Sequence, residues 1–310
     1  MFDRDRFRGC LLGLACGDAV GTAVEFEAPG TFEPIRDMVG GGAFGLEPGQ
    51  WTDDTSMALC LAASLTEKGW DPRDQMERYV RWWRDGYYSS TGECFDIGGA
   101  TRAALSRFLQ TGDPFSGSED PKTAGNGSLM RLAPVPMFYA ATPEEAIERA
   151  AESSRTTHAA ATAVDACRYF AGLLVSALRG APKEQLLEPF HAPCPGYWQQ
   201  HSLHEEIAEV AGGSFRRREP PEIQGAGFVV RSLEAALWAF DRAQSFEEAV
   251  LKAANLGCDA DTTAAICGQI AGAHYGAAGI PKHWLAKLCM RKEIERLADA
   301  LYERAAVTGA

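Results

Sequence analysis

The 310-residue sequence lacks any excess of basic side chains. It contains 30 Lys and Arg against 42 Asp and Glu, which gives a formal net charge of −12. A surface for nucleic acid or for an anionic membrane needs clustered Lys and Arg, so this charge argues against both partners. It does not exclude an anionic small ligand, because a bound metal ion reverses the local field.

Long hydrophobic runs are lacking as well. No run approaches the roughly 20 apolar residues of a membrane span. FRGCLLGLAC at residues 7–16 looks superficially like a lipoprotein signal, but Cys10–Cys16 is at the lower limit of a signal core, which takes roughly 7–15 residues. Asp3 and Asp5 stand where a basic leader should be. We therefore expect no signal, no membrane association and a cytoplasmic protein.

Cysteine-based motifs are absent. The nine cysteines, an odd number, include no CxxC pair, and no His stands near them at zinc-site spacing. We expect reduced thiols that serve as small core residues, which fits a reducing compartment.

The composition, with 46% hydrophobic and 23% charged residues, is enough for a full core and argues against disorder. The length allows one large domain or two ordinary ones. No internal repeat and no separating linker is present, so we expect one domain over residues 1–310.

Helical periodicity dominates the chain, and alternating strand patterns are scarce; Phe228-Val229-Val230 is a short exception. Thr142-Pro143-Glu144-Glu145 and Ser245-Phe246-Glu247-Glu248 carry the capping-box signature of a helix start. We therefore predict an all-α fold. Apolar residues recur at spacings of three and four in Met57–Leu65, Met76–Trp83, Thr101–Leu109, Ala146–Ser153, Ala159–Leu178, Ser232–Phe240 and Trp284–Tyr302.

Loops are expected at Gly40–Gly49, Thr111–Gly127, Pro189–Gln199 and Gly212–Gly227. The last of these contains Arg216-Arg217-Arg218, which we interpret as a solvated loop rather than a binding site.

Two glycine ladders stand out, Gly13-Gly17-Gly21 and Gly268-Gly272-Gly276. Glycine within a helix costs about 1 kcal/mol relative to alanine, so a stripe of three needs a reason. A smooth stripe lets another backbone approach closely. Because Asp18 and His274 lie in these segments, we predict tightly packed core helices of a soluble protein; flexible linkers are the alternative.

Two acidic clusters each stand directly before an apolar segment. Thr52-Asp53-Asp54-Thr55 precedes Ser56–Leu65, and Asp259-Ala260-Asp261-Thr262-Thr263 precedes Ala264–Tyr275. Helix capping favours Asp and Thr, but it needs one such residue and not four. Buried unpaired carboxylates are costly, and few basic residues stand nearby to pair them. A shared cation resolves this.

The donors in both clusters are oxygen atoms only, from carboxylates and hydroxyls. This set suits hard ions such as Mg²⁺ or Mn²⁺ and not zinc, and the sequence does not choose between the two. If the clusters meet, four carboxylates support two ions roughly 3.5–4 Å apart.

These motifs, taken together, are similar to those of the ADP-ribosylglycohydrolase family. The FDIG segment with its aromatic lead resembles the arginine-directed branch of dinitrogenase reductase-activating glycohydrolases more than the serine-directed branch. Residues 182–225 match least well. The matching stretches, in family order, are GCLLGLACGDAVGTAVEFE (Gly9–Glu27), WTDDTSMAL (Trp51–Leu59), WWRDGYYSSTGECFDIG (Trp82–Gly98), GNGSLMRLAPV (Gly125–Val135), TTHAAATAVDACRYFA (Thr156–Ala171) and NLGCDADTTAAICGQIAGAHYG (Asn255–Gly276).

The resemblance implies a compact orthogonal helical bundle with two Mg²⁺ or Mn²⁺ ions. It also implies hydrolysis of the bond between the anomeric carbon of ADP-ribose and a modified side chain, most of all the N-glycosidic bond of ADP-ribosyl-arginine. By motif position, the metal ligands would be Thr52, Asp53, Asp54, Asp259, Asp261 and Thr262.

Cleavage of an N-glycosidic bond builds positive charge on the sugar, and the leaving group needs a proton. Glu25 is the first candidate for the acid/base or for a residue at the metal edge; the alternative is a surface Glu beside Glu27. Asp96, between apolar neighbours, is the second candidate, and we expect it to be partly buried. An N-cap role for the following helix is the alternative for Asp96.

Five further residues are candidates for substrate binding. The turn Asn126-Gly127-Ser128 precedes a helix-like stretch whose backbone N–H groups suit a phosphate; a plain glycine turn is the alternative. His158 matches a family position near the phosphates or the distal ribose, and otherwise is a core histidine. Phe228 would stack on adenine or serve as a core aromatic. Asp18 would order the metal ligands from behind or pair with the backbone.

Other functions stay open at this stage. One alternative is an enzyme that hydrolyses another ADP-ribose linkage, to Ser or Thr, to nucleic acid or to a small guanidine compound. Another alternative is a protein that binds ADP-ribose without turnover. A phosphohydrolase is less favoured, since that class commonly uses His ligands. The expected partner is an ADP-ribosylated protein or a small ADP-ribosyl conjugate, and a monomer is expected.

Overall fold

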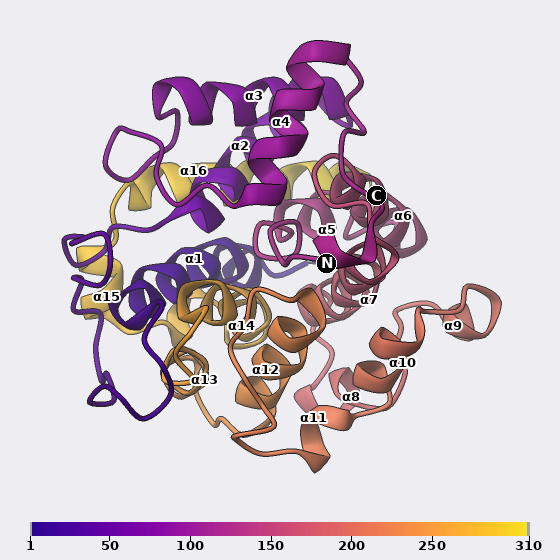
Figure 1. Ribbon diagram of the computed structural model, residues 1–310. Coiled ribbons are helices and arrows are strands. Elements are labelled where there is room, and N and C mark those ends of the chain that lie inside the picture. Colours follow the sequence, from indigo (N-terminus) through magenta and orange to yellow (C-terminus); the bar gives the residue numbers. More distant parts are fainter. Residues whose placement is uncertain (1, 309–310) are drawn as a thin grey trace.

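The computed structural model describes residues 2–308, and helices make up most of them (Figure 1). Three short 3₁₀ helices, Thr22–Val24, Pro121–Thr123 and Ala277–Gly279, complete the set. The α-helices are α1 (Arg4–Gly21), α2 (Asp53–Lys68), α3 (Pro72–Asp85), α4 (Gly99–Thr111), α5 (Pro134–Phe138), α6 (Pro143–Arg155), α7 (Ala161–Leu178), α8 (Lys183–Leu186), α9 (Tyr197–Gln200), α10 (Glu205–Ala211), α11 (Ser214–Arg217), α12 (Val229–Asp241), α13 (Phe246–Ala254), α14 (Ala260–Tyr275), α15 (Lys282–Lys287) and α16 (Arg291–Thr308).

The predicted all-α class is confirmed, because residues 2–308 contain isolated β-bridges but no strand. Val229 and Val230, which looked strand-like, begin α12. The capping signals mark real helix starts. The Ser245 hydroxyl accepts the Glu248 N–H at 3.1 Å, and Thr142 stands at the N-cap of α6, where its hydroxyl donates to the Glu145 carboxylate at 3.2 Å.

One helix prediction was wrong. The segment expected as one helix from Trp284 to Tyr302 is divided into α15 and α16 by a turn at residues 288–290. Gly49, in the left-handed backbone region at φ 96°, lies directly against Lys287 and Leu288, and its carbonyl accepts the Cys289 N–H at 2.9 Å. The break is a tertiary contact from a distant loop, which periodicity does not reveal.

Three of the predicted loops contain short helices, and the one in Thr111–Gly127 is the 3₁₀ helix Pro121–Thr123. Pro189–Gln199 runs into α9, and Gly212–Gly227 contains α11. The arginine run lies over α11 and forms ion pairs on the surface: Arg216 with Asp241, and Arg218 with Glu209 and Glu234. Two of its three charges are therefore paired with carboxylates, and Arg217 donates to the Gly212 carbonyl at 3.2 Å.

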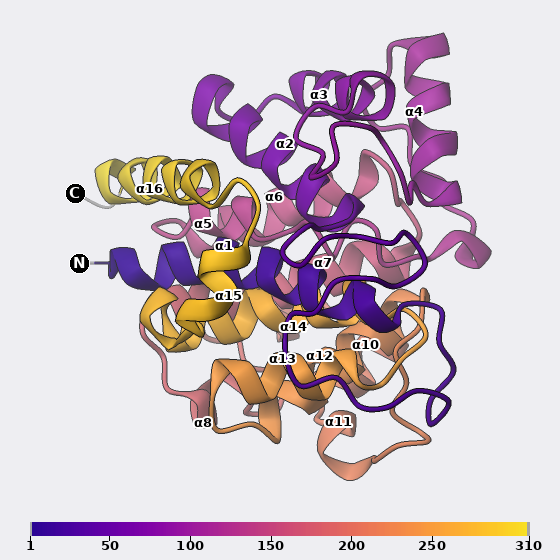
Figure 2. The ribbon, with the colours of Figure 1, turned by 90° about the vertical axis from the view of Figure 1, so that its left-hand side faces the viewer.

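The two glycine ladders face each other. A side-chain carbon added at Gly13 would overlap the carbonyl oxygen of Gly268, and one added at Gly9 would overlap that of Gly272. Helices α1 and α14 therefore lie antiparallel with their backbones in direct contact (Figure 2). The prediction of tightly packed core helices is confirmed for both segments, and the linker alternative is wrong.

The α1–α14 pair organises the rest of the fold. Helices α2, α3 and α4 lie on one side of the pair, and α12 and α13 lie on the other (Figures 1 and 2). One large hydrophobic cluster extends from Phe7 of α1 to Ala305 of α16. Because α1 and α14 are antiparallel, the C-terminal end of α1 meets the N-terminal end of α14, where the second acidic cluster stands.

By length and composition alone, two helical segments could cross a membrane, contrary to the expectation that none would. They are Arg4–Val24 and Ala161–Leu178, with 89% and 83% of their most apolar window buried inside the protein. Core helices give the same signal, so it is weak evidence for a membrane span.

All nine cysteines are free. Five are buried, namely Cys10, Cys16, Cys60, Cys167 and Cys267, and four are partly buried. This agrees with the prediction of thiols used as small core residues.

Candidate metal centre and adjoining cavities

The two Asp/Thr clusters meet. Thr52 is the N-cap residue of α2 and Asp259 that of α14, and the Thr52 hydroxyl lies 3.0 Å from Oδ2 of Asp261. Neither N-cap side chain makes a capping hydrogen bond. The alternative that these acids and threonines serve as caps is therefore not realised, and their oxygen atoms are directed at one another.

Asp18 joins α1 to the first cluster. Its Oδ1 accepts the N–H and the hydroxyl of Thr52, both at 2.9 Å, and its Oδ2 accepts those of Thr55 at 3.0 and 2.6 Å. Both alternatives for Asp18 hold at once, because it pairs with backbone and orders the cluster from behind. Burial raises the pKa of Asp18 to about 6, although these hydrogen bonds oppose the shift.

The Thr52 hydroxyl is surrounded by more acceptors than it can serve. Carboxylate oxygens of Asp18, Asp54 and Asp261 lie 2.9, 3.3 and 3.0 Å from Thr52 Oγ1, which carries one proton. Oδ1 of Asp54 and Oδ1 of Asp261 are buried with no hydrogen-bond partner among the described residues. Such a cluster needs protons or a cation to be stable.

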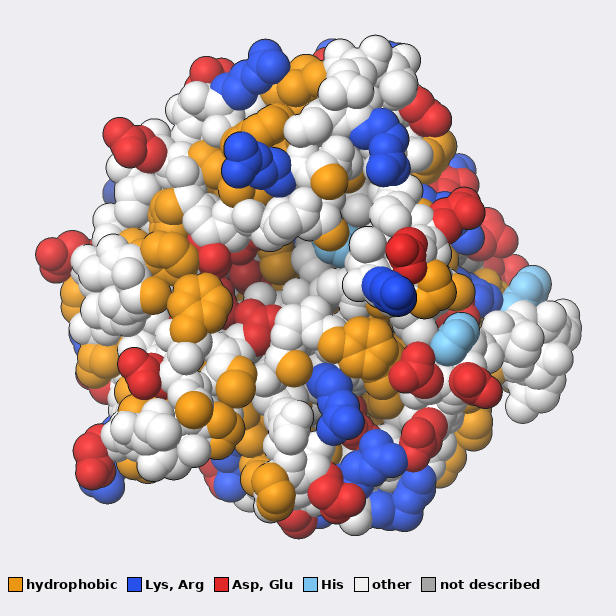
Figure 3. Space-filling model, viewed as in Figure 1, with side chains coloured by type: hydrophobic (Ala, Val, Ile, Leu, Met, Phe, Trp, Pro, Cys, Tyr) orange, Lys and Arg blue, Asp and Glu red, His pale blue; other side chains and the backbone are white. Residues whose placement is uncertain are grey.

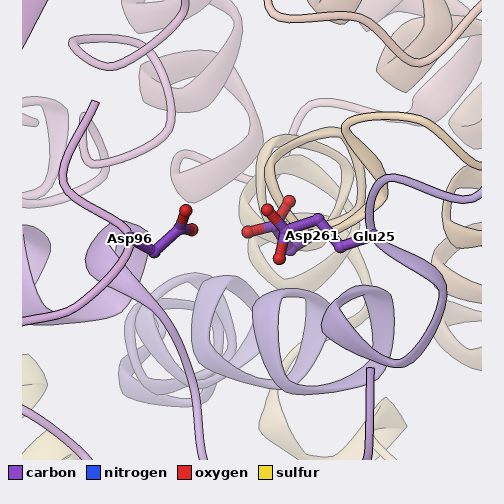
Figure 4. Close-up of side chains that lie close together, drawn as sticks. All are labelled: Glu25, Asp96 and Asp261. Carbon is purple, nitrogen blue, oxygen red and sulfur yellow. The ribbon is translucent and has the colours of Figure 1, made fainter. Parts of the chain in front are cut away.

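Glu25 and Asp96 join the cluster from two loops. Three carboxylate oxygens, one each from Glu25, Asp96 and Asp261, lie within 4.8 Å of one another. Figure 4 shows the three side chains converging. Glu25 is 4% exposed, so the alternative of a surface glutamate is wrong. Asp96 is partly buried, as expected, but it is not the N-cap of α4, because Gly98 occupies that position.

Burial and mutual repulsion raise the pKa values across the cluster. Burial first, then Asp96, Asp259 and Asp18, raise the pKa of Glu25 to about 9. Burial, followed by Asp18 and Asp259, raises that of Asp96 to about 7. The pKa values of Asp53, Asp54 and Asp261 are raised well above the usual range for the same reasons.

These residues fit a divalent cation. The unpartnered oxygens of Asp54 and Asp261 point to a missing positive charge, and no Lys or Arg is among the residues that line the acidic cavity. The donors are carboxylate and hydroxyl oxygens, the set that Mg²⁺ and Mn²⁺ prefer.

The acidic cavity has a volume of about 250 Å³. Figure 3 shows Asp and Glu side chains in a hollow near the centre of one face, with hydrophobic side chains beside it. Thr52, Asp54 and Asp261 do not line the cavity and lie behind its wall. Among the predicted site residues, its lining includes Glu25, Asp53, Asp96, Asn126, Gly127, His158, Asp259 and Thr262.

Two predicted substrate residues use their side chains within the protein. Asn126 donates from Nδ2 to Asp259 at 2.6 Å and to the Ser232 hydroxyl at 2.9 Å, so it positions a metal-ligand candidate. Ser128 is buried. Because the Ser154 hydroxyl donates to the His158 carbonyl, the Ser128 hydroxyl must donate to Ser154, and its proton is directed away from the cavity.

A second cavity of about 520 Å³ adjoins the first. The two share Gly99, Ala100, Gly125 and Gly227 in their linings. Arg107 and Lys122 line the second cavity, and Phe228, which is 38% exposed, lines it as well. The alternative of Phe228 as a core aromatic is therefore wrong.

Sequence reasoning missed an aromatic group beside the acidic cavity. Phe26, 65% exposed and with φ 65°, lines the cavity. Its ring centroid lies 6.2 Å from that of Phe44, which lies 5.2 Å from that of Phe95. We refer to these three side chains as the aromatic rim. The available signal was a phenylalanine between two glutamates, Glu25 and Glu27, in a segment that otherwise ends a buried helix.

A larger cavity of about 800 Å³ is lined in part by Cys258 and has a mostly apolar lining, including Pro221, Trp238 and Leu251. Its lining contains none of the site residues predicted from the sequence. Volume alone would therefore point away from the acidic cluster.

Comparison with known proteins extends over nearly the whole chain. A family model described as ADP-ribosylglycohydrolase matches residues 2–310. The chain is 44% identical to the ADP-ribosylarginine hydrolase Tri1 of Pseudomonas putida (strain GB-1), over 97% of this chain and 79% of that protein. It is 32% identical to the ADP-ribosyl-[dinitrogen reductase] glycohydrolase of Rhodospirillum rubrum, over 96% of this chain and 95% of that protein. A solved structure of an ADP-ribosylglycohydrolase-related protein complex matches with a TM-score of 0.86 and 48% identity, covering 97% of this chain and 98% of that chain.

Proposed function

The chain belongs to the ADP-ribosylglycohydrolase family, and from this premise we propose that it removes ADP-ribose from modified arginine side chains. The proposed reaction is hydrolysis of the N-glycosidic bond between the anomeric carbon of ADP-ribose and a guanidinium nitrogen. A relative that is 44% identical over nearly the full chain is named for this activity, which favours arginine over other linkages.

The observation that carries the proposal is the junction of two cavities of opposite character. One holds the acidic cluster with Glu25 and Asp96, and the other holds Arg107, Lys122 and Phe228. ADP-ribose matches this arrangement. Basic side chains attract its pyrophosphate, an aromatic ring stacks on its adenine, and its terminal ribose then lies toward the carboxylates.

We propose that two Mg²⁺ or Mn²⁺ ions are held by Thr52, Asp53, Asp54, Asp259, Asp261 and Thr262, with Glu25 or Asp96 at the edge. The unpartnered carboxylate oxygens and the crowded Thr52 hydroxyl support this set. When bound, such ions supply positive charge that orients ribose hydroxyls and acidifies water. The anionic ligand and the acidic cluster would otherwise repel each other.

Glu25 and Asp96 are the proposed proton-handling pair. Water adds to the anomeric carbon and loses one proton, while the departing guanidine nitrogen gains one, so an acid and a base are both required. Without a cation, burial and the neighbouring carboxylates raise the pKa of Glu25 to about 9 and that of Asp96 to about 7. Bound cations would lower both pKa values, so the assignment of the pair rests on its geometry. Their close approach at the cavity wall supports a role on one reacting bond.

The aromatic rim supports arginine as the linked residue. A guanidinium is attracted electrostatically to the face of an aromatic ring, and Phe26 lines the same cavity as the proton-handling pair. A serine leaving group would gain nothing comparable from these rings.

The test is ADP-ribose release from an ADP-ribosyl-arginine substrate, with Mg²⁺ or Mn²⁺ added and with EDTA. We expect release that requires the metal and is lost in Asp261→Asn and Asp261→Ala. Asp85→Asn, the same change at an exposed position on α3, is the matched control and should retain full activity. Circular dichroism checks that each variant is folded.

The alternatives give different outcomes. Release from seryl or nucleic-acid conjugates but not from ADP-ribosyl-arginine would assign another linkage. Tight binding of ADP-ribose without release from any conjugate would identify a binding protein on the same fold. Loss of activity in Asp85→Asn would show that the assay reports stability and not the site.

We further propose a monomer that forms one domain over residues 1–310 and works in the cytoplasm. The nine unpaired cysteines support a reducing compartment. The expected partner is an ADP-ribosylated protein or a small ADP-ribosyl conjugate.

A further inference from the structure

Arg131 is a fully buried cation behind the acidic cavity. Its Nη1 donates to the carbonyl of Gly127 at 2.9 Å, and its Nη2 donates to the Thr157 hydroxyl at 2.8 Å. Its guanidinium lies 4.7 Å from the centroid of the Tyr79 ring. Within residues 2–308, the hydrogen-bond acceptors of Arg131 are carbonyl and hydroxyl oxygens, and none of them is a carboxylate. A guanidinium only donates hydrogen bonds, so every group that is hydrogen-bonded to Arg131 must be the acceptor of that bond.

The Thr157 hydroxyl lies between Arg131 and His158. It accepts from Arg131, and its oxygen is 2.8 Å from Nδ1 of His158. A threonine hydroxyl has a single proton, and the contacts of residues 2–308 offer that proton no acceptor other than Nδ1. If Nδ1 carried a proton instead, the buried Thr157 hydroxyl proton would have no partner, which is costly. The ring proton of His158 therefore belongs on Nε2.

Nε2 of His158 is directed toward the cavity wall. A side-chain carbon added at Gly125 would lie 3.4 Å from Nε2, and one added at Gly127 would lie 3.2 Å from it. The absence of side chains at these glycines therefore leaves room in front of Nε2, and His158 lines the acidic cavity. Within residues 2–308, no group forms a hydrogen bond with Nε2 of His158; the hydrogen bond of its ring is at Nδ1.

The backbone of His158 is held in place independently of the ring. The Ser154 hydroxyl donates to the His158 carbonyl at 2.8 Å, and the Ala159 N–H donates to the Ser118 carbonyl at 3.1 Å. Burial, and then the charge of Arg131, lower the pKa of His158 to about 3, so the ring stays neutral at physiological pH.

We propose that Arg131 and Thr157 are positioning residues that hold His158 as the Nε2–H tautomer, so that it donates a hydrogen bond to an oxygen of the ligand. The nature of that oxygen rests on the proposed function, which makes it a phosphate or ribose oxygen of ADP-ribose. A neutral donor held in a fixed direction recognises such an oxygen without adding a charge that titrates near pH 7.

The test begins with the ligand-free protein. Long-range ¹⁵N–¹H spectra of protein labelled at its six histidines report which ring nitrogen carries the proton, and His158→Gln identifies the resonances of His158. We expect Nε2 to be protonated and Nδ1 to show the shift of a hydrogen-bond acceptor. In Thr157→Val, Nδ1 should move to the position of an unbonded nitrogen, and Thr157→Ser should restore it.

Thr156→Val is the matched control. Thr156 is buried beside Thr157 and is also near Arg131, at 3.2 Å, but its hydroxyl donates to the Ser153 carbonyl and not to the histidine. It should leave the Nδ1 shift of His158 unchanged. A wild-type protein with the proton on Nδ1, or a Thr157→Val variant with an unchanged Nδ1 shift, would overturn the proposal.

Binding completes the test. We expect Thr157→Val to weaken ADP-ribose binding about 10-fold, as for the loss of an orienting partner, and Thr157→Ser to recover it. Unchanged affinity in Thr157→Val would overturn the positioning role. If the wild type does not bind ADP-ribose at all, the proposed function fails. The tautomer of His158, measured without ligand, still tests whether Arg131 and Thr157 hold the ring proton on Nε2.

Discussion

The hydroxyl of Thr52 lies 3.0 Å from Oδ2 of Asp261, although 209 positions separate these residues in the chain. The contact exists because α1 and α14 lie antiparallel along their glycines, and because Asp18 on α1 holds the start of α2. Two helix N-termini thus bring acidic residues together where each carboxylate destabilises the next. A cation at this point would stabilise the folded state and would also favour binding of the anionic ligand.

Addition of Mg²⁺ or Mn²⁺ should raise the melting temperature of EDTA-treated protein. A cation that binds only the folded chain stabilises it by about 2.7 kcal/mol at 100 times its dissociation constant. Differential scanning fluorimetry across a metal titration measures the effect. Asp261→Asn should remove most of the shift, and Asp85→Asn should keep it. A melting temperature insensitive to both metals would argue against a metal site here.

Metal-free protein should become less stable as the pH rises from about 5 to 9. The pKa of Glu25 is about 9 in the folded chain against an ordinary value of 4.5. Between these values the folded chain retains a proton that the unfolded chain has released, so stability falls with rising pH, by at most about 1.4 kcal/mol per pH unit for one group. Urea unfolding in EDTA measures this slope.

The matched variants for the pH dependence are Glu25→Gln and Glu184→Gln. The first removes one of several buried titrating groups and should make the slope less steep by the contribution of that group, whereas the second, at an exposed position on α8, should leave it unchanged. Excess Mg²⁺ should reverse the trend, because metal binding favours the deprotonated carboxylates. Stability that rises with pH in EDTA would contradict the raised pKa of Glu25.

Gly13→Ala should destabilise the protein by about 1–3 kcal/mol, since the new methyl group would overlap the backbone of α14 at Gly268. Gly99→Ala, in the first turn of α4, is the control. A carbon added there meets nothing within 4 Å, so no loss of stability is expected. Equal effects of the two changes in denaturant unfolding would mean that helix propensity, and not the α1–α14 contact, determines the response.

The glycine ladders and acidic clusters were predictable from the sequence because each is a local pattern with a physical cost. Glycine in a helix and carboxylates before an apolar segment both need a partner, and the antiparallel α1–α14 pair provides the geometry for both. The break between α15 and α16 was not predictable, because its cause is the contact with Gly49, more than 200 positions earlier.

Side-chain roles within the site were harder to predict than membership of the site. Asn126 and Ser128 stand in a turn that suits phosphate binding, yet their side chains are bonded to Asp259 and Ser154. Which hydroxyl proton goes to which acceptor depends on neighbours from other segments, and a motif does not contain that information. The roles of Arg131 and Thr157 were missed for the same reason.

Phe26→Ala should raise the KM for an ADP-ribosyl-arginine substrate by about 5- to 10-fold, which corresponds to roughly 1 kcal/mol for a lost guanidinium–ring contact. Binding of free ADP-ribose, which lacks the guanidinium, should change little. Steady-state kinetics and calorimetry separate the two quantities. Phe26 is suited to this test because its ring is mostly exposed, so its removal leaves the core intact.

Phe190→Ala is the matched control for the aromatic rim. Phe190 is also an exposed phenylalanine with a left-handed backbone, at φ 56°, but it lines neither the acidic cavity nor the one beside it. It should leave both KM and ADP-ribose affinity unchanged. If Phe26→Ala weakens free ADP-ribose as much as the arginine conjugate, the ring contacts the ribose and not the guanidinium, and selectivity for arginine must come from the carboxylates of Glu25 and Asp96.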